Sequence, residues 1–162
     1  MKHPLSELVS DRVSKLSVGR VFRYVFEHQD VRDKIVQLQK EQLGRGDDSK
    51  GGQFRDYSLV SLDVYNKPTK SPFFDPSGGD SIRLYDSGRF YQSIFVRAMS
   101  EEIAIITGIS QFPGDDGSEV DLTAIVGPDI LGLAPESMQE LKKFILPITR
   151  ETTLKILNGQ IL

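Results

Sequence analysis

The sequence contains no cysteine, and this absence excludes disulfide bonds, thiolate nucleophiles and cysteine-ligated metals. Histidine is also scarce: His3 and His28 are the two in the chain, and neither stands in a motif with other ligands or catalytic partners. An excess of positive charge is missing as well, because 20 lysines and arginines against 23 acidic residues give a net charge of −3. We therefore expect no sequence-specific binding of nucleic acid.

Long apolar runs are absent too. No segment approaches the roughly 18 apolar residues of a membrane span, and the first 16 residues carry Ser, Glu and Asp where a signal peptide would need an apolar stretch. We expect a soluble chain that has no contact with a membrane. A length of 162 residues, with 38% hydrophobic and 27% charged residues, predicts one folded domain over residues 1–162.

Apolar residues recur at helical spacing from Asp11 to Leu43, which predicts either one long helix or two helices joined near Gln29 and Asp30. Glycine, proline and charged residues then concentrate in three long loops, at 44–53, 66–80 and 111–121. We expect the first two loops to sample many conformations in the isolated subunit and to order mainly against neighbouring chains.

Two β-rich runs, at residues 93–99 and 102–110, predict a β-hairpin. The second run is apolar on both faces, which is typical of a strand covered on both sides. A C-terminal helix is predicted to begin at Pro135 and to kink or restart before Pro147, because proline lacks the amide donor of a helix interior. Its expected apolar stripe is Met138, Leu141, Phe144, Ile145 and Ile148.

The stretch LYDSGRFYQSI, residues 84–94, places polar residues between apolar and aromatic ones. Asp86 is expected to cap a short helix, and Gly88 to permit a close approach of the chain. Phe90, Ser93 and Ile94 would then share one helical face. These residues predict a structural corner and no catalytic site.

Phe73 and Phe74 lie within the loop at 66–80. Two adjacent aromatic side chains in such a loop are expected to be buried, either in the core of this subunit or against a partner.

The acidic loops are the candidates for a metal site. Asp47 and Asp48 lie in one loop, and Asp115, Asp116, Glu119 and Asp121 in another. Neither group has the spacing of a helix-flanked calcium loop, and solvated loops account for both. The glycines at 44–53 do not form a phosphate-binding motif either. We therefore expect no metal, no cofactor and no enzymatic activity.

Seven residues carry a resemblance to a known family: Leu84, Asp86, Ser87, Gly88, Phe90, Ser93 and Ile94. Their pattern, just before a predicted β-hairpin, resembles the signature of the virion-morphogenesis and tail-completion (head-tail joining) proteins of tailed bacteriophages. Residues 42–58 and 128–147 are similar to two segments of a branch found in phages and prophages of Bacteroides-type bacteria. Ala134 and Ser137 stand where that branch has a capping Thr and an Asn.

The resemblance implies an α+β fold, in which a long N-terminal helix and a C-terminal helix pack on a curved, mainly antiparallel sheet. It also implies a structural protein of the phage neck or tail, found in the virion and in the host cytoplasm during assembly. Such a protein would form a homo-oligomeric ring, dock to portal, neck or tail proteins, and catalyse no reaction. The alternative is a small protein-binding module, encoded by a phage or mobile element, that acts on a host protein.

Overall fold

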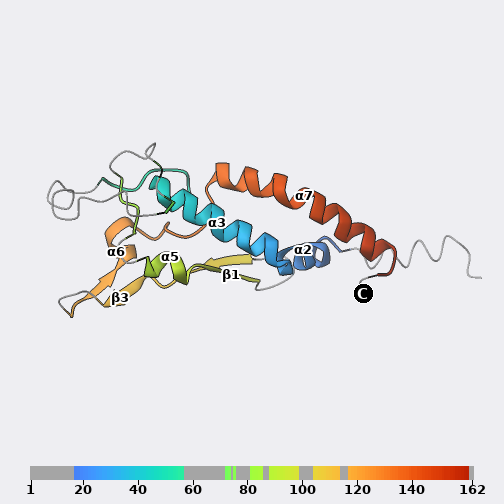
Figure 1. Ribbon diagram of the computed structural model, residues 1–162, viewed down its shortest axis with the longest axis horizontal. Coiled ribbons are helices and arrows are strands. Elements are labelled where there is room, and N and C mark those ends of the chain that lie inside the picture. The colour runs from blue at the N-terminus through green and yellow to red at the C-terminus, as the bar shows by residue number, and fades with distance from the viewer. Residues whose placement is uncertain are drawn as a thin grey trace, which may run out of the picture.

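A computed structural model describes residues 17–56, 72, 73, 75, 81–85, 88–98, 104–113 and 117–160. Its elements are helices α2 (Val18–Glu27), α3 (Gln29–Arg45), α5 (Arg89–Ser93), α6 (Leu122–Val126) and α7 (Pro135–Leu157), and strands β1 (Phe95–Ala98), β2 (Ala104–Thr107), β3 (Gln111–Pro113) and β4 (Glu119–Asp121). Helices and antiparallel strands in one chain confirm the predicted α+β class (Figure 1).

The N-terminal helical region consists of two helices, which confirms the second of the two predicted alternatives. The break lies at His28, whose backbone is extended between α2 and α3. Ser17 caps the start of α2 by accepting a hydrogen bond from the Arg20 amide, and the Arg32 side chain donates to the carbonyl of Phe26 in the last turn of α2. The turn between the helices is thus held by a side chain of the second helix.

The predicted hairpin is confirmed, since β1 and β2 pair antiparallel with Phe95 opposite Thr107. A second hairpin, β3 with β4, lies where a loop was predicted over residues 111–121, so that prediction is wrong for the described part of the segment. Strands of three residues are too short to give a periodic signal. The described strands therefore form two two-stranded sheets instead of one curved sheet.

Helix α7 begins at Pro135, as predicted, but it does not restart near Pro147. It is one continuous helix from Pro135 to Leu157. Proline at position 147 has no amide to donate to the carbonyl of Lys143, one turn earlier. Both residues are exposed, so water can hydrate that carbonyl. Leu141 and Ile156, on either side of this position, are buried in the core and hold the two halves of the helix.

The predicted apolar stripe of α7 is correct in part. Leu141 is buried, and Ile145 and Ile148 pack on the core, but Met138 and Phe144 lie at the surface.

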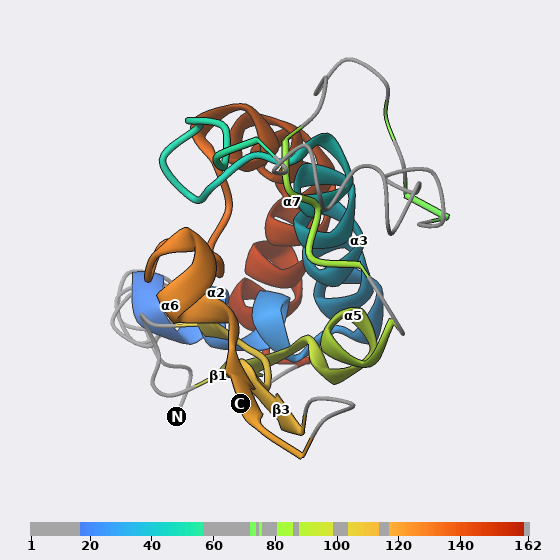
Figure 2. The same ribbon diagram turned by 90° about the vertical axis from the view of Figure 1, so that its left-hand side faces the viewer.

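Two clusters of buried side chains form the core, one among α2, α3, β1 and α7 and the other around α5 and the C-terminal end of α3. Val36 and Ile106 contact both clusters, so the core is continuous. The view along the helices shows α7 and α3 on one side and the strands and α5 on the opposite side (Figure 2).

Candidate functional site at the end of helix α3

Two fully buried glutamines of α3 bind the segment that leads into α7. The Gln42 side chain accepts a hydrogen bond from the Ala134 amide at 2.7 Å and donates to the carbonyl of Gly132 at 3.0 Å. Gln39, one turn earlier, accepts from the Gly132 amide and donates to the carbonyl of Ile130. Each glutamine acts as a substitute for a backbone amide and fixes where α7 begins.

The loop at 44–53 is held by hydrogen bonds within the subunit, so the prediction that it orders mainly against neighbouring chains is wrong. The Asp48 carboxylate accepts from the amides of Lys50 and Gly52, both at 2.8 Å, and the Asp48 amide donates to the carbonyl of Gly52. Lys50 Nζ lies 2.7 Å from a carboxylate oxygen of Asp129, and this hydrogen bond raises the pKa of Lys50 above its ordinary value. The loop is therefore tied to the segment before α7.

A second segment crosses α3 at Gly44. A Cβ atom on Gly44 would lie 1.8 Å from the carbonyl oxygen of Phe73, so only glycine fits there. The carbonyl of Gly44 accepts from the Asp75 amide and from Nε of Arg83, which is fully buried. Arg83 also donates to the carbonyls of Ser81 and Asp75. Its guanidinium thus joins three backbone segments.

Helix α5 begins at Arg89, with Gly88 at the N-cap position in a left-handed conformation (φ 78°). The prediction that Asp86 takes the N-cap position is therefore wrong; Asp86 and Ser87 themselves lie outside the described residues. The predicted close approach at Gly88 is confirmed, because a Cβ atom there would lie 3.1 Å from the Tyr85 hydroxyl oxygen. The left-handed backbone and the close contact with Tyr85 both favour glycine at this position.

The apolar residues of the same motif form part of the core. Phe90 and Ile94 are buried, as expected from their shared helical face. Ser93 connects α5 to the hairpin, because its hydroxyl donates to the carbonyl of Phe90 at 2.7 Å and accepts from the Ile109 amide at 2.9 Å. This serine has a structural role.

Tyr91 was not singled out from the sequence, although its position is central. Its hydroxyl donates to the carbonyl of Arg83 at 2.7 Å, and its ring stacks on Phe73 with 5.9 Å between centroids. For Phe73 the structure thus favours burial within the subunit, whereas Phe74 lies outside the described residues. Leu84, just after Arg83, has a left-handed backbone (φ 53°), which costs roughly 1–2 kcal/mol for a residue with a Cβ atom.

The three stretches that carry the family resemblance meet at this end of α3. Phe54, Phe90 and Ile130, one from each stretch, are buried in the same cluster. We call this meeting point the α3 junction. Among the described residues, no buried side-chain nitrogen or oxygen lacks a hydrogen-bond partner. The polar groups of the α3 junction therefore bind the backbone of their own chain.

Three of the acidic residues considered for a metal site have partners within the chain. Asp47 pairs with Arg45 at 2.8 Å, and Asp48 binds loop amides. Asp121 caps α6 by accepting from the amide and hydroxyl of Thr123, which holds its pKa below the ordinary value. No group of three potential ligands occurs within the described ranges; Asp115 and Asp116 lie outside them.

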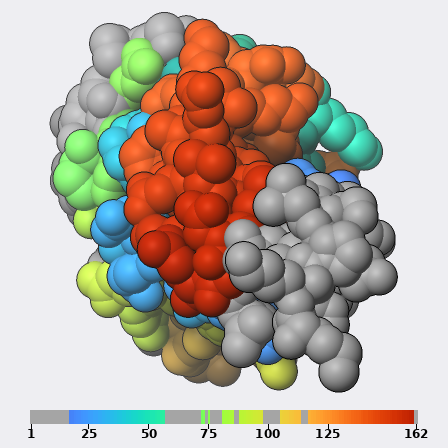
Figure 3. Space-filling view, turned by 90° about the vertical axis from the view of Figure 1, so that its right-hand side faces the viewer, coloured from blue at the N-terminus to red at the C-terminus, as the bar shows by residue number. Residues whose placement is uncertain are grey.

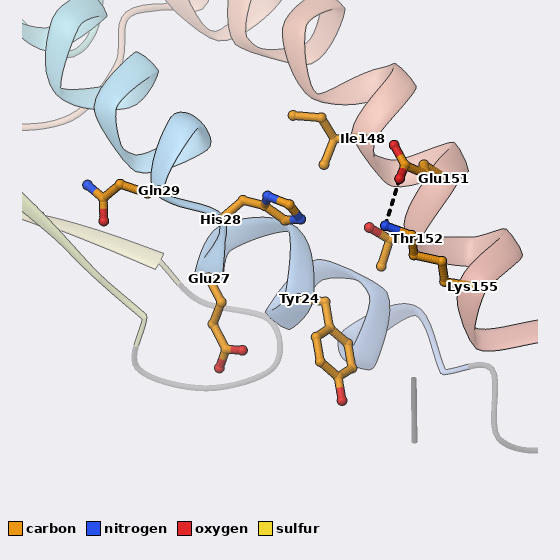
Figure 4. A pocket seen from close by; sticks show the side chains of 8 residues that line it. All are labelled: Tyr24, Glu27, His28, Gln29, Ile148, Glu151, Thr152 and Lys155. Carbon is orange, nitrogen blue, oxygen red and sulfur yellow. Dashed lines mark ion pairs between the residues drawn. The ribbon is translucent and has the colours of Figure 1, made fainter. Parts of the chain in front are cut away.

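A cleft of about 360 Å³ lies between the turn at His28 and the C-terminal half of α7 (Figure 4). Tyr24, Ile148 and Thr152 line it together with an ion pair between Glu151 and Lys155, 2.6 Å apart. Lys155 lowers the pKa of Glu151 by hydrogen bonding and charge, and His28 adds to that effect. The other histidine, His3, lies outside the described residues.

The outer face of β1 and β2 is uncovered by the described chain. Phe95, Ile105 and Ile109 are 51%, 44% and 58% exposed, so the predicted cover on both sides of the second strand is wrong within this subunit. A second exposed apolar line runs along α7, where Leu146 is 68% and Leu154 is 53% exposed. Apolar area of this kind on opposite faces suggests contacts with other chains.

No helix among the described residues is long and apolar enough to cross a membrane. Comparison with known proteins gave no matching family model, no matching curated protein and no matching solved structure.

Proposed function

We propose that this chain is a structural protein of the neck or tail of a tailed bacteriophage. It would act by self-association and by docking to portal or tail proteins, in the virion and in the host cytoplasm during assembly. The observation that carries the proposal is the α3 junction. Three stretches that are far apart in the sequence resemble segments of that family, and one residue of each is buried in one cluster. Their meeting at one point of the fold supports taking the three resemblances together.

The chemistry of the α3 junction supports a structural role. Gln39, Gln42 and Arg83 are the buried groups best suited to bind a ligand, and each is engaged by backbone of the same chain. Groups used in this way fix the relative positions of helices and loops. A ring subunit needs such a rigid body, because small errors in each subunit accumulate around the ring.

One observation favours the alternative, a small module that binds a host protein. The cleft beside His28 combines an aromatic ring, an aliphatic side chain and charged groups of both signs, as peptide-binding surfaces often do (Figure 4). The test is to pass a host-cell extract over the immobilised chain and to identify proteins that wild type retains and Glu151→Lys, a change at an exposed residue of the cleft, does not. A host protein that meets this criterion supports the module.

The test of the main proposal is the protein content of purified phage particles. We expect mass spectrometry to find the chain in particles, and cryo-electron microscopy to place it as a ring between head and tail. Particles purified from a lysate that produces the chain but do not contain it would contradict the proposal. A major capsid protein measured in the same sample serves as the control for recovery.

A further inference from the structure

Helix α7 is followed by an asparagine and a glycine, Asn158 and Gly159. The Gly159 amide donates to the carbonyl of Ile156 at 3.0 Å, and the Gln160 amide donates to the carbonyl of Lys155 at 2.9 Å. These two hydrogen bonds form a Schellman motif, in which the residue after the helix cap has a left-handed backbone. Gly159 has φ 71°, so the end of α7 favours glycine directly after Asn158.

This turn lies at the surface of the subunit. Asn158, Gly159 and Gln160 are exposed, and the space-filling view shows the C-terminal part of α7, in red, at the surface (Figure 3). Apart from its chain neighbours, no described residue comes within 4 Å of the position that a Cβ atom of Gly159 would take. Among the described residues, the Asn158 side chain has no hydrogen-bond partner. The described chain therefore leaves this side chain free to turn toward the Gly159 nitrogen.

An asparagine side chain in this position can react with its own main chain. The Gly159 nitrogen, after loss of its proton to hydroxide, attacks Cγ of Asn158 and closes a five-membered ring, and Nδ2 takes up a proton from water and leaves as ammonia. The succinimide then adds one water molecule at either of its carbonyls and opens to aspartate or to isoaspartate. The sum is the exchange of ammonia for water. Glycine is the least hindered nucleophile for this step, because it has no side chain beside its nitrogen.

The folded turn does not have the geometry of the ring. In the ring, the Gly159 nitrogen is eclipsed with Cβ of Asn158, and the tetrahedral geometry of Cα then requires ψ of roughly −120° at Asn158. The observed ψ is −2°. Rotation to the reactive value turns the Gly159 amide away from the Ile156 carbonyl and breaks both hydrogen bonds of the Schellman motif. Cyclisation therefore requires the turn to open.

We infer that Asn158 is a self-modifying site, which deamidates to aspartate and isoaspartate at a rate set by the opening of the last turn of α7. The opening is local. Ile156 is the last buried residue of α7, so the turn beyond it can open while the rest of the helix stays packed on the core.

The product carries a negative charge where a helix disfavours it. The carbonyls at the C-terminal end of a helix already carry partial negative charge. Lys155, three residues before the new carboxylate, pairs with Glu151 at 2.6 Å, so the product competes with Glu151 for this lysine. Isoaspartate also lengthens the main chain by one carbon, which disrupts the spacing of the two hydrogen bonds. Deamidation thus loosens the last turn and the ion pair that lines the cleft beside His28.

The reaction depends on the chain alone. In phage particles, whose proteins are not renewed after assembly, the product would accumulate with age, and this consequence rests on the proposed function. A purified chain that keeps its Asn158 amide would refute the modification and leave the structural role. Deamidation of a chain that is absent from particles would do the reverse.

The first measurement compares the two asparagines of the chain, Asn158 and Asn66. Asn66 is the internal control, because it is followed by lysine, whose side chain hinders the attacking nitrogen. The full chain is kept for several weeks at about pH 7 in guanidinium chloride, digested with trypsin and compared by mass spectrometry with a sample digested at the start. Asn158 should lose its amide at least about tenfold faster than Asn66. Equal rates would overturn the assignment of the site.

The products identify the route. An isoaspartyl methyltransferase should label the aged peptide that begins at Ile156, because opening of the succinimide gives isoaspartate as well as aspartate. A peptide that has lost its amide but takes up no label would show direct hydrolysis of the side chain, and would overturn the cyclisation.

The second measurement tests the opening of the turn. In buffer without denaturant, Asn158 should lose its amide at least about tenfold more slowly than in guanidinium chloride, because both hydrogen bonds are then in place. Protection of the Gly159 amide from hydrogen exchange, measured by NMR, should match this ratio within about threefold, since one opening controls both reactions. Equal deamidation rates in the two conditions, or protection more than about tenfold above the ratio, would overturn the control by opening.

Two alanine variants change the turn without touching Asn158. Ile156→Ala removes the last buried side chain of α7 and should speed deamidation of the folded chain at least about fivefold. The matched control Leu154→Ala, at a side chain that is 53% exposed, should change the rate by less than about twofold. Circular dichroism checks that both variants are folded, and Ile156→Val replaces an unfolded Ile156→Ala. Equal rates in the variant and the control would overturn the role of this anchor.

The effect of the product is measured with Asn158→Asp. Asn158→Gln is the neutral control, and its longer side chain cannot close the five-membered ring. Hydrogen exchange of the Gly159 amide should be about two- to fivefold faster in Asn158→Asp than in Asn158→Gln, because the added charge opposes the helix dipole. Equal exchange in the two variants would overturn the loosening of the turn.

Discussion

Replacing Gly44 with alanine tests the packing of the α3 junction most directly. Glycine inside a helix is less stable than alanine by roughly 0.5–1 kcal/mol, so the sequence alone predicts that Gly44→Ala stabilises α3. The structure predicts the opposite sign. The new Cβ atom would lie 1.8 Å from the carbonyl oxygen and 2.6 Å from the carbonyl carbon of Phe73, and backbone cannot yield as a side chain can.

The expected cost follows from what must move. Insertion of a methyl group into a packed site costs about 1–3 kcal/mol. Displacing the crossing segment also weakens the hydrogen bond from the Asp75 amide to the Gly44 carbonyl, which contributes about 0.5–1.5 kcal/mol. After the helix propensity of alanine is subtracted, Gly44→Ala should lower the free energy of unfolding by about 1–3 kcal/mol.

Urea unfolding of the full chain, followed by circular dichroism, measures this change. A double-mutant cycle with Phe73→Ala identifies its cause, because displacement of the segment in Gly44→Ala should already have weakened the stacking of Phe73 on Tyr91. Phe73→Ala should then cost less in the Gly44→Ala background than in wild type. A stability of Gly44→Ala equal to or above that of wild type would refute the crossing at Gly44.

Three further variants test the core and the pH dependence of stability. Gln42→Leu should lower the free energy of unfolding by about 2–5 kcal/mol in urea unfolding, since it leaves the buried Ala134 amide and the part-buried carbonyls of Asp48 and Gly132 without this partner. The control Gln37→Leu, on the exposed side of α3, should change it by less than about 0.5 kcal/mol. Phe90→Ala should cost about 3–5 kcal/mol in the same assay, and a cost under about 1 kcal/mol would contradict its burial. The pKa of Asp121 is lowered below its ordinary value of 3.8, so its ionised form stabilises the fold above that pH and the contribution is lost as the pH falls through the folded pKa. Asp121→Asn should therefore lose less stability than wild type between about pH 5 and pH 3, and equal losses would exclude the cap as the cause.

The elements that the sequence predicted correctly are those with a local signal. The break near Gln29, the hairpin of β1 and β2 and the start of α7 at Pro135 depend on residues within one or two turns of each feature. The cap at α5 was predicted at the wrong residue because both Asp86 and Gly88 are suitable, and the choice depends on the close contact between Gly88 and Tyr85.

The contacts of the α3 junction could not be predicted from the sequence, for a different reason. Gln39 and Gln42 look like ordinary polar residues of an exposed helix, and Arg83 looks like a solvated charge. These side chains are buried because they bind backbone groups of segments that lie up to about 90 positions away in the chain. A pattern within a window of helical or strand length cannot predict such a distant partner. The order of the loop at 44–53 has the same origin, because Lys50 reaches Asp129.

The described side chains differ in how completely the subunit itself covers them. Its buried polar side chains are all satisfied within the described structure, yet Leu146 and Ile105 remain at the surface of regular elements. Residues four apart on α7 lie on one side of the helix, so Leu146 and Leu154 belong to one exposed surface. Since hydrogen bonds from Gln39 and Gln42 fix α3 against the start of α7, the proposed self-association would need no change in the fold.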